Sequence, residues 1–132
     1  IKSIKYLFNK NINVYVISNQ SGIARGYFTH KDVDDLHEYL RNFIIKNEAT
    51  INKIYISPFH KDGVIKRYKK NSSCRKPGIK LFKILLKEWG INDKSRLIMI
   101  GDQISDQKFA ENAKIKFSFF KEGNLYNLVS KI

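Results

Sequence analysis

Three short segments of this chain hold side chains that could bind an anionic ligand or a metal ion. The first spans residues 18–26 and reads SNQSGIARG, so Ser18, Asn19 and Gln20 are followed by Ser21 and two glycines. Hydroxyls, side-chain amides and free backbone N–H groups all donate hydrogen bonds to anionic oxygens. Taken alone, the segment is equally typical of an anion site and of an ordinary polar turn.

The second segment, Cys74-Arg75-Lys76-Pro77, places two adjacent cations directly before an expected helix. Cations at a helix N-terminus suit a phosphate group, because the helix dipole adds to their charge. A basic turn in a basic protein is the alternative interpretation.

The third segment, Gly101-Asp102-Gln103-Ile104-Ser105-Asp106, has two carboxylates four residues apart. They straddle an expected loop-to-helix junction and could face one point, where hard oxygen ligands suit Mg²⁺. An N-capping Asp followed by a first-turn Asp would give the same pattern.

Apolar, β-branched runs predict the strands that must position these segments, over 12–17, 53–57, 96–100 and 115–120. Helical spacing predicts helices over 2–9, 29–46, 77–89, 106–113 and 124–129, and a loop over 19–28. Thr29 and Asp32 form a carboxylate variant of the capping box, Pro77 suits a first helical turn, and Gly90 suits a helix end.

Alternating helices and strands predict a layered α/β fold with parallel strands and right-handed crossovers. Ligands of such sheets bind at the carboxyl ends of the strands. The informative segments follow the expected strands that end at Ile17, Ile56 and Ile100, so we expect them to meet at one edge.

Composition limits the class of protein. A chain of 132 residues, 42% of them hydrophobic, fits one domain with a proper core. One Cys excludes an internal disulfide framework and a multi-Cys zinc site. No apolar run approaches the roughly 20 residues that cross a bilayer, and no signal-peptide pattern opens the chain, so we expect a cytoplasmic protein without a membrane partner.

The net charge of +13 has two interpretations. Abundant Lys, Ile and Asn are typical of an AT-biased genome, which would make much of the charge a solvated surface. A basic surface could also attract phosphorylated ligands or nucleic acid. The densest run, KRYKK at 66–70, is short and holds one aromatic, so we expect no nucleic-acid partner. We also expect the protein to be a monomer.

Together the three segments resemble the haloacid dehalogenase superfamily of phosphatases. The resemblance is closest to the D-glycero-D-manno-heptose 1,7-bisphosphate phosphatase branch, and next to the histidinol-phosphate phosphatases. It implies a three-layer sandwich with a mostly parallel, doubly wound sheet, and a single phosphatase domain over 1–132.

The resemblance also implies roles for the motif residues. Ser18 would bind the transferred phosphoryl group and Lys76 would offset its charge and that of the nucleophile. Asp102 would ligate Mg²⁺, with Asp106 supporting it directly or indirectly. Substrate contacts would come from Asn19, Gln20, Ser21, Arg75 and Gln103, although Gln103 stands where the branch often has Lys.

Two departures from the family pattern bear on function. The first concerns a structural zinc that this branch often holds. In this chain the two segments that correspond to the zinc-binding segments of that branch are Ser57, Pro58 and Phe59, and then Ser72, Ser73 and Cys74. Cys74 and the nearby His60 do not make a closed tetrahedral site, so we expect no zinc and a loop held by packing.

The second departure concerns the family's Asp-x-Asp motif, whose first Asp is the nucleophile and whose second is the general acid and base. The motif precedes the Ser-Asn-Gln block in the family. Asp32-Val33-Asp34 follows that block here and lies in an expected first helical turn. We therefore expect an N-terminally incomplete domain that lacks about 20–40 residues, including the first strand.

That missing strand would lie between the strands ending at Ile17 and Ile100, and its absence would leave their facing edges unpaired. The resemblance implies an Mg²⁺-dependent phosphatase acting on a sugar phosphate in bacterial surface-glycan precursor synthesis, inactive as these 132 residues alone. The alternatives are a pseudophosphatase or basic interaction module, and a histidinol-phosphate or polynucleotide phosphatase.

Overall fold

The strands pair in parallel, as the alternation of helices and strands predicts. A computed structural model describes all residues, 1–132. Strand β1 (Tyr15–Asn19) pairs with β2 (Lys53–Ser57), with Val16 opposite Ile54. Strand β3 (Ile98–Gly101) pairs with β4 (Lys116–Phe119), with Met99 opposite Phe117. These are two separate two-stranded sheets rather than one continuous doubly wound sheet, because no strand joins β1 to β3.

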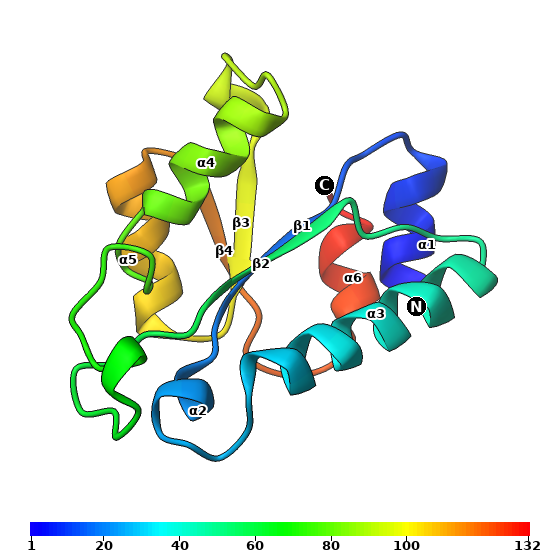
Figure 1. The fold of residues 1–132 in the computed structure, drawn as a ribbon. Helices are drawn as coiled ribbons and strands as arrows, with labels where there is room; N and C mark the ends of the chain where they lie inside the picture. Colours follow the sequence, from blue (N-terminus) through cyan, green and yellow to red (C-terminus); the bar gives the residue numbers. More distant parts are fainter.

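Helices cover both faces of the strands (Figure 1). On one side are α4 (Lys80–Glu88) and α5 (Ile104–Ala113); on the other are α1 (Lys2–Asn9), α3 (His30–Lys46) and α6 (Leu125–Val129). The short elements α2 (Ser21–Ala24), η1 (Lys66–Tyr68) and η2 (Lys94–Arg96) lie in the connections. None of the helices combines the length and apolar composition needed to span a bilayer.

Side chains of β1 alternate between the two layers, which explains the apolar run Tyr15-Val16-Ile17 at its start. Val16 packs with the cluster around Ile44 of α3, whereas Ile17 packs with the clusters around Leu81 and Phe82 of α4. Phe82 also meets Phe109 of α5 edge to face at 5.8 Å. A strand covered on both faces carries apolar residues at consecutive positions.

Several predicted boundaries move. The strand predicted over 12–17 begins at Tyr15, because Ile12 belongs to the turn after α1 and its N–H donates to Leu7 O at 2.9 Å. The helix predicted from Pro77 begins only at Lys80, because Gly78 N–H bonds back to Arg75 O at 2.8 Å in a turn. The loop predicted over 19–28 contains the short helix α2.

Two cap predictions are confirmed. Thr29 N–H donates to Asp32 Oδ2 at 2.8 Å, and Asp32 N–H donates to Thr29 Oγ1 at 3.1 Å, which is the reciprocal capping box at the start of α3. Gly90 follows α4 with a φ of +60°, the left-handed conformation that ends many helices.

Candidate active site

The carboxyl ends of β1, β2 and β3 lie at the same end of the molecule (Figure 1). Helix α2 leaves β1 there, the loop 58–79 leaves β2, and α5 begins just after β3. The structure therefore brings the three sequence segments to one edge, as expected for parallel strands.

The side chain of Asn19 joins the end of β1 to the segment before α4. Its Oδ1 accepts the N–H of Lys76 at 2.9 Å, and its Nδ2 donates to Lys76 O at 3.2 Å. Both groups of the amide thus bind the backbone of one residue, 57 positions along the chain. Asn19 fixes the position of the Lys76 backbone. This positioning role differs from the substrate contact that the family resemblance implies.

Lys76 in turn joins this loop to α5. Its Nζ lies 2.6 Å from Asp106 Oδ1, and the two side chains are only 12% and 5% exposed. Removing two charges from water is costly, so a buried pair of this kind must be held in good geometry by its surroundings.

The other carboxylate oxygen of Asp106 holds the loop after β3. Oδ2 accepts the N–H groups of both Asp102 and Gln103, each at 3.1 Å. Gly101 makes this approach possible, because a Cβ there would lie 2.4 Å from Asp106 Cβ. Oδ2 is engaged by two backbone N–H groups, and Oδ1 lies in the ion pair with Lys76 although the contact does not meet hydrogen-bond geometry. This arrangement favours a supporting role over direct metal ligation.

Asp102 is the carboxylate that remains available to a metal. Its side chain is exposed and takes part in no hydrogen bond or ion pair. Mg²⁺ in proteins is held by one or two carboxylates together with water and substrate phosphate oxygens. Asp102 fits one ligand position of such an ion.

Ser18 lies one residue before the end of β1, and its hydroxyl oxygen accepts a hydrogen bond from Gln20 Nε2 at 2.9 Å. This bond uses an acceptor site of the hydroxyl and leaves its proton free to be donated. Gln20 itself is tied down through its own N–H, which donates to Ser57 O at 2.8 Å. The pair therefore presents an oriented O–H donor at the strand end.

Arg75 lies in a cluster with Arg25 and His60. Its Nη1 is buried without a hydrogen-bond partner, and burial and Arg25 both lower the pKa of its guanidinium. Arg25 Nη2 lies 3.4 Å from His60 Nε2. Burial, Arg75 and Arg25 lower the pKa of His60, so its ring is neutral over a wider pH range than usual.

A cavity of about 240 Å³ opens beside this cluster, with Arg75 and Lys76 in its wall. Its other lining residues are His60, Lys61, Lys70, Asn71, Ser72 and Pro77. Sequence reasoning missed His60 and the two lysines as site residues, and it missed Arg25 although that residue lies inside the SNQSGIARG segment. Gly101 belongs to the third segment, but the sequence does not predict the close approach of Asp106 that it permits.

Cys74, the one residue left from the zinc pattern, and the nearby His60 have different surroundings. Cys74 packs against the apolar cluster of Tyr55, Leu81 and Leu85. His60 Nδ1 accepts the N–H of Asp62 at 3.1 Å. No three His, Cys, Asp or Glu side chains are grouped as a metal site would require. The absence of zinc stays a prediction.

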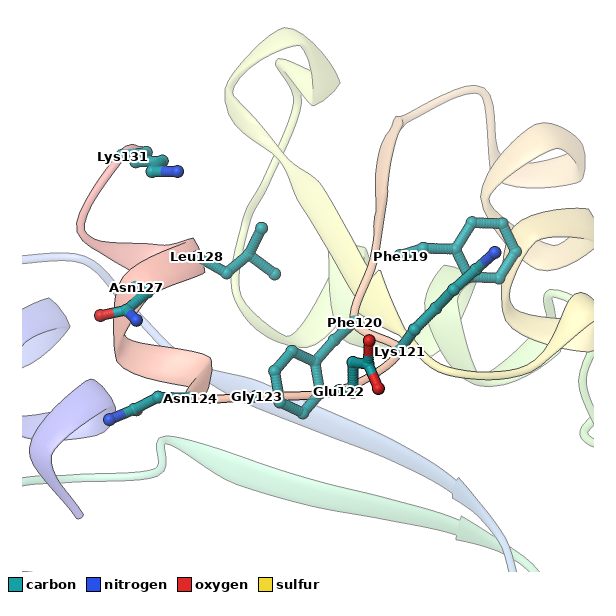
Figure 2. Close-up of a pocket in the computed structure, with 9 residues that line it drawn as sticks. All are labelled: Phe119, Phe120, Lys121, Glu122, Gly123, Asn124, Asn127, Leu128 and Lys131. Atoms are coloured by element: carbon teal, nitrogen blue, oxygen red, sulfur yellow. The ribbon is translucent and has the colours of Figure 1, made fainter.

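A second cavity, of about 260 Å³, lies between the end of β4 and α6 (Figure 2). Figure 2 shows Phe120, Glu122 and Lys121 on the connection and Asn127, Leu128 and Lys131 on or after the helix. None of the residues predicted from the sequence lines it.

Comparison with known proteins agrees with the motifs. Residues 73–126 match the model of the HAD-hydrolase-like family. The D-glycero-beta-D-manno-heptose-1,7-bisphosphate 7-phosphatase of Rhodopseudomonas palustris is 34% identical over 113 residues, which are 86% of this chain and 62% of the relative. The enzyme of the same name from Haemophilus influenzae is 32% identical over 118 residues, 89% of this chain and 63% of the relative. The chain thus spans somewhat under two thirds of these relatives.

A solved structure shares the fold. The crystal structure of D,D-heptose 1,7-bisphosphate phosphatase from B. bronchiseptica, complexed with magnesium and phosphate, superposes with a TM-score of 0.80. The match covers 99% of this chain and 69% of that one at 21% sequence identity.

Proposed function

Because the chain belongs to the HAD-like hydrolases and is homologous over most of its length to heptose-1,7-bisphosphate 7-phosphatases, we propose that it forms the phosphoryl-binding part of a phosphatase. Its substrate would be a sugar phosphate, D-glycero-D-manno-heptose 1,7-bisphosphate, and its product would serve bacterial surface-glycan precursor synthesis.

One observation carries the proposal: the buried Lys76–Asp106 pair links the loop before α4 to the loop after β3. Asn19 ties the same lysine to the end of β1. A cation held in a water-poor site at the carboxyl ends of strands is suited to a phosphoryl group, whose negative charge it offsets. Preorganised charge of this kind requires no rearrangement when a ligand enters.

The side chains around this pair have complementary tasks. Ser18 would donate its hydroxyl proton to a phosphoryl oxygen, since Gln20 already occupies an acceptor site of that hydroxyl. The ammonium of Lys76 would face the same group from the opposite loop. Asp102 would hold Mg²⁺, which when bound supplies further neutralisation of phosphoryl charge. Asp106 would keep Lys76 and the backbone of Asp102 in place.

The nucleophile would come from a strand inserted between β1 and β3. Two facts support this. Strand β1 pairs only with β2 and β3 only with β4, so each has a free edge. The Asp32-Val33-Asp34 carboxylates are engaged elsewhere: Asp32 caps α3, and Asp34 Oδ2 lies 3.1 Å from His30 Nδ1. The inserted strand would also satisfy backbone groups of both edges.

Phosphate release from D-glycero-D-manno-heptose 1,7-bisphosphate with Mg²⁺ tests the proposal, using the product of the complete reading frame. Lys76→Met and Asp102→Asn should each lower kcat/KM by about 100-fold or more, the effect of removing one charge-stabilising group. The control Lys80→Met removes an exposed lysine four residues from Lys76 and should stay within about twofold.

Two alternatives give different results in the same assay. A pseudophosphatase or basic interaction module releases no phosphate, whether the complete product or the 132-residue chain is assayed. Histidinol-phosphate and a phosphorylated oligonucleotide serve as the competing substrates, and faster turnover of either would replace the heptose assignment. The 132 residues by themselves should release no phosphate; release above the blank would contradict a nucleophile supplied by another strand.

A further inference from the structure

We propose that helix α3 is the contact surface of a homodimer, in which α3 of one chain packs antiparallel against α3 of a second copy about a two-fold axis at Tyr39. The inference does not depend on the proposed phosphatase function, because the residues that carry it lie outside the three sequence motifs. It replaces the monomer that we expect from the sequence alone.

Helix α3 has two apolar faces, whereas a helix on the surface of a domain needs only one. Val33 and Ile44 are buried and form the inner face, where Ile44 packs with residues of β1 and β2. About a quarter of a turn round the helix lies a stripe of Leu36, Tyr39 and Phe43, which are 62%, 70% and 46% exposed. The helix runs along one margin of the molecule in Figure 1. A contiguous exposed apolar stripe of this kind is typical of an interaction surface.

A charged residue continues the stripe at each end. Asp32, Leu36, Tyr39, Phe43 and Lys46 follow one another at spacings of four, three, four and three residues. This is the a/d spacing with which two helices pack side by side. The two charged ends are equally far from Tyr39, so a two-fold axis there places Asp32 of one chain opposite Lys46 of the other. It also places Leu36 opposite Phe43 and Tyr39 opposite its own copy, as one patch that contacts itself requires.

The charges of α3 select the antiparallel orientation. Its first half, residues 30–38, holds four acidic residues, Asp32, Asp34, Asp35 and Glu38. Its second half, residues 39–46, holds Arg41 and Lys46 and no acidic residue. Parallel packing would bring like charges together, whereas antiparallel packing brings the acidic half of each helix to the basic half of the other.

Asp32 and Lys46 can both pair with the second copy without losing a partner in their own chain. The exposed side chain of Lys46 forms no ion pair within the chain. Asp32 uses Oδ2 to accept the N–H of Thr29 in the capping box, which leaves Oδ1 available. An ion pair between the two chains would therefore keep the cap at the start of α3 intact.

The size of the stripe predicts a weak dimer. A standard interface buries about 800 Å² per partner, and one face of a single helix offers less. We therefore expect a reversible dimer with a Kd in the micromolar range rather than an obligate one. Tyr39 at the centre should contribute most, because central aromatic residues carry much of the binding free energy of such contacts.

Sedimentation velocity of the product of the complete reading frame, from micromolar to near-millimolar concentration, tests the dimer. The expected result is a monomer–dimer equilibrium. Leu36→Lys and Tyr39→Lys should each raise the Kd by about tenfold or more, because each substitution enters the interface twice and buries an unpaired charge. Ile45→Lys is the matched control, since Ile45 is 57% exposed on the same helix, half a turn from Leu36. It should leave the Kd within about twofold.

Two further variants test the antiparallel register. Lys46→Glu places an acidic residue opposite Asp32 of the second copy and should raise the Kd by about fivefold. Tyr39→Cys places two thiols at the two-fold axis, so mild oxidation should cross-link the dimer. The control Ile45→Cys should remain uncross-linked, and a Cys74→Ser background removes the native thiol from both.

A monomer at every concentration would overturn the proposal, and a stripe covered by another segment of the complete protein would give this result. A dimer that Leu36→Lys and Tyr39→Lys leave intact would overturn it as well, as would one that Ile45→Lys weakens equally. Preferred cross-linking of Ile45→Cys would contradict the register. Far-UV circular dichroism checks that each variant is folded; where a lysine variant is not, the cross-linking of Tyr39→Cys decides.

Discussion

The buried pair of Lys76 and Asp106 should contribute measurably to the stability of the fold. In Asp106→Asn the amide can still accept the N–H groups of Asp102 and Gln103, but Lys76 loses its counter-charge. Because the Lys76 side chain is only 12% exposed, its ammonium cannot easily return to water. Breaking such a pair costs about 3–5 kcal/mol. We expect about 3 kcal/mol for Asp106→Asn, since the hydrogen bonds to the backbone survive in part.

A double-mutant cycle separates the pair from its surroundings. Lys76→Met keeps most of the length of the side chain, removes its charge and leaves Asp106 buried and unpaired. The double variant Lys76→Met/Asp106→Asn buries no charge, so it should cost less than the sum of the single variants. Urea unfolding should give a coupling free energy of about 2 kcal/mol, within the range for contacting residues.

The exposed pair of Lys31 and Asp35 is the matched control. Its N···O distance is 2.5 Å, close to that of the buried pair, but its side chains are 80% and 58% exposed. The same cycle there, Lys31→Met with Asp35→Asn, should give a coupling free energy several times smaller than that of the buried pair, because water screens the exposed charges. Equal coupling free energies for the two pairs would refute the reasoning that burial gives the Lys76–Asp106 contact its strength.

Two further variants test the surroundings of the site and the strand layer. Gly101→Ala should lower the free energy of unfolding by about 1–3 kcal/mol, because its Cβ would overlap the buried carboxylate beside it; an unchanged urea midpoint would contradict this. Hydrogen bonds from Lys53 and Tyr55 hold the pKa of Glu88 below its usual 4.5. The ionised carboxylate of Glu88 therefore stabilises the fold above about pH 4.5, and this stabilisation is lost as the pH falls through the folded-state pKa. Glu88→Gln should therefore lose less stability than the unsubstituted chain between about pH 6 and about pH 3 in urea unfolding, and parallel losses would refute the linkage.

The sequence predicts most of what positions the site. Strand β1 can be predicted from the sequence because its alternate side chains enter two apolar layers, which requires a run of apolar residues. The start of α3 is readable because its capping box involves residues three apart. Signals of this kind are local, or they are repeated along one element.

Contacts between distant segments cannot be predicted from such local sequence patterns. The bond from Asn19 to the backbone of Lys76 depends on where two loops meet in space, and the residue type fits a substrate contact equally well. The sequence places the start of α4 too early, because Pro77 is as compatible with a turn as with a first helical turn. Lys61 and Lys70 look like surface charge in a sequence of +13, and only the fold brings them to one cavity.

Binding of inorganic phosphate to the 132-residue chain is the most direct test of the central claim, that the strand ends form a phosphoryl and magnesium site. Phosphate should bind more tightly with Mg²⁺ than without it. Lys76→Met should weaken binding by about tenfold in either condition, while Asp102→Asn should abolish the Mg²⁺ enhancement alone. Phosphate affinity that is unchanged in both variants would contradict the account.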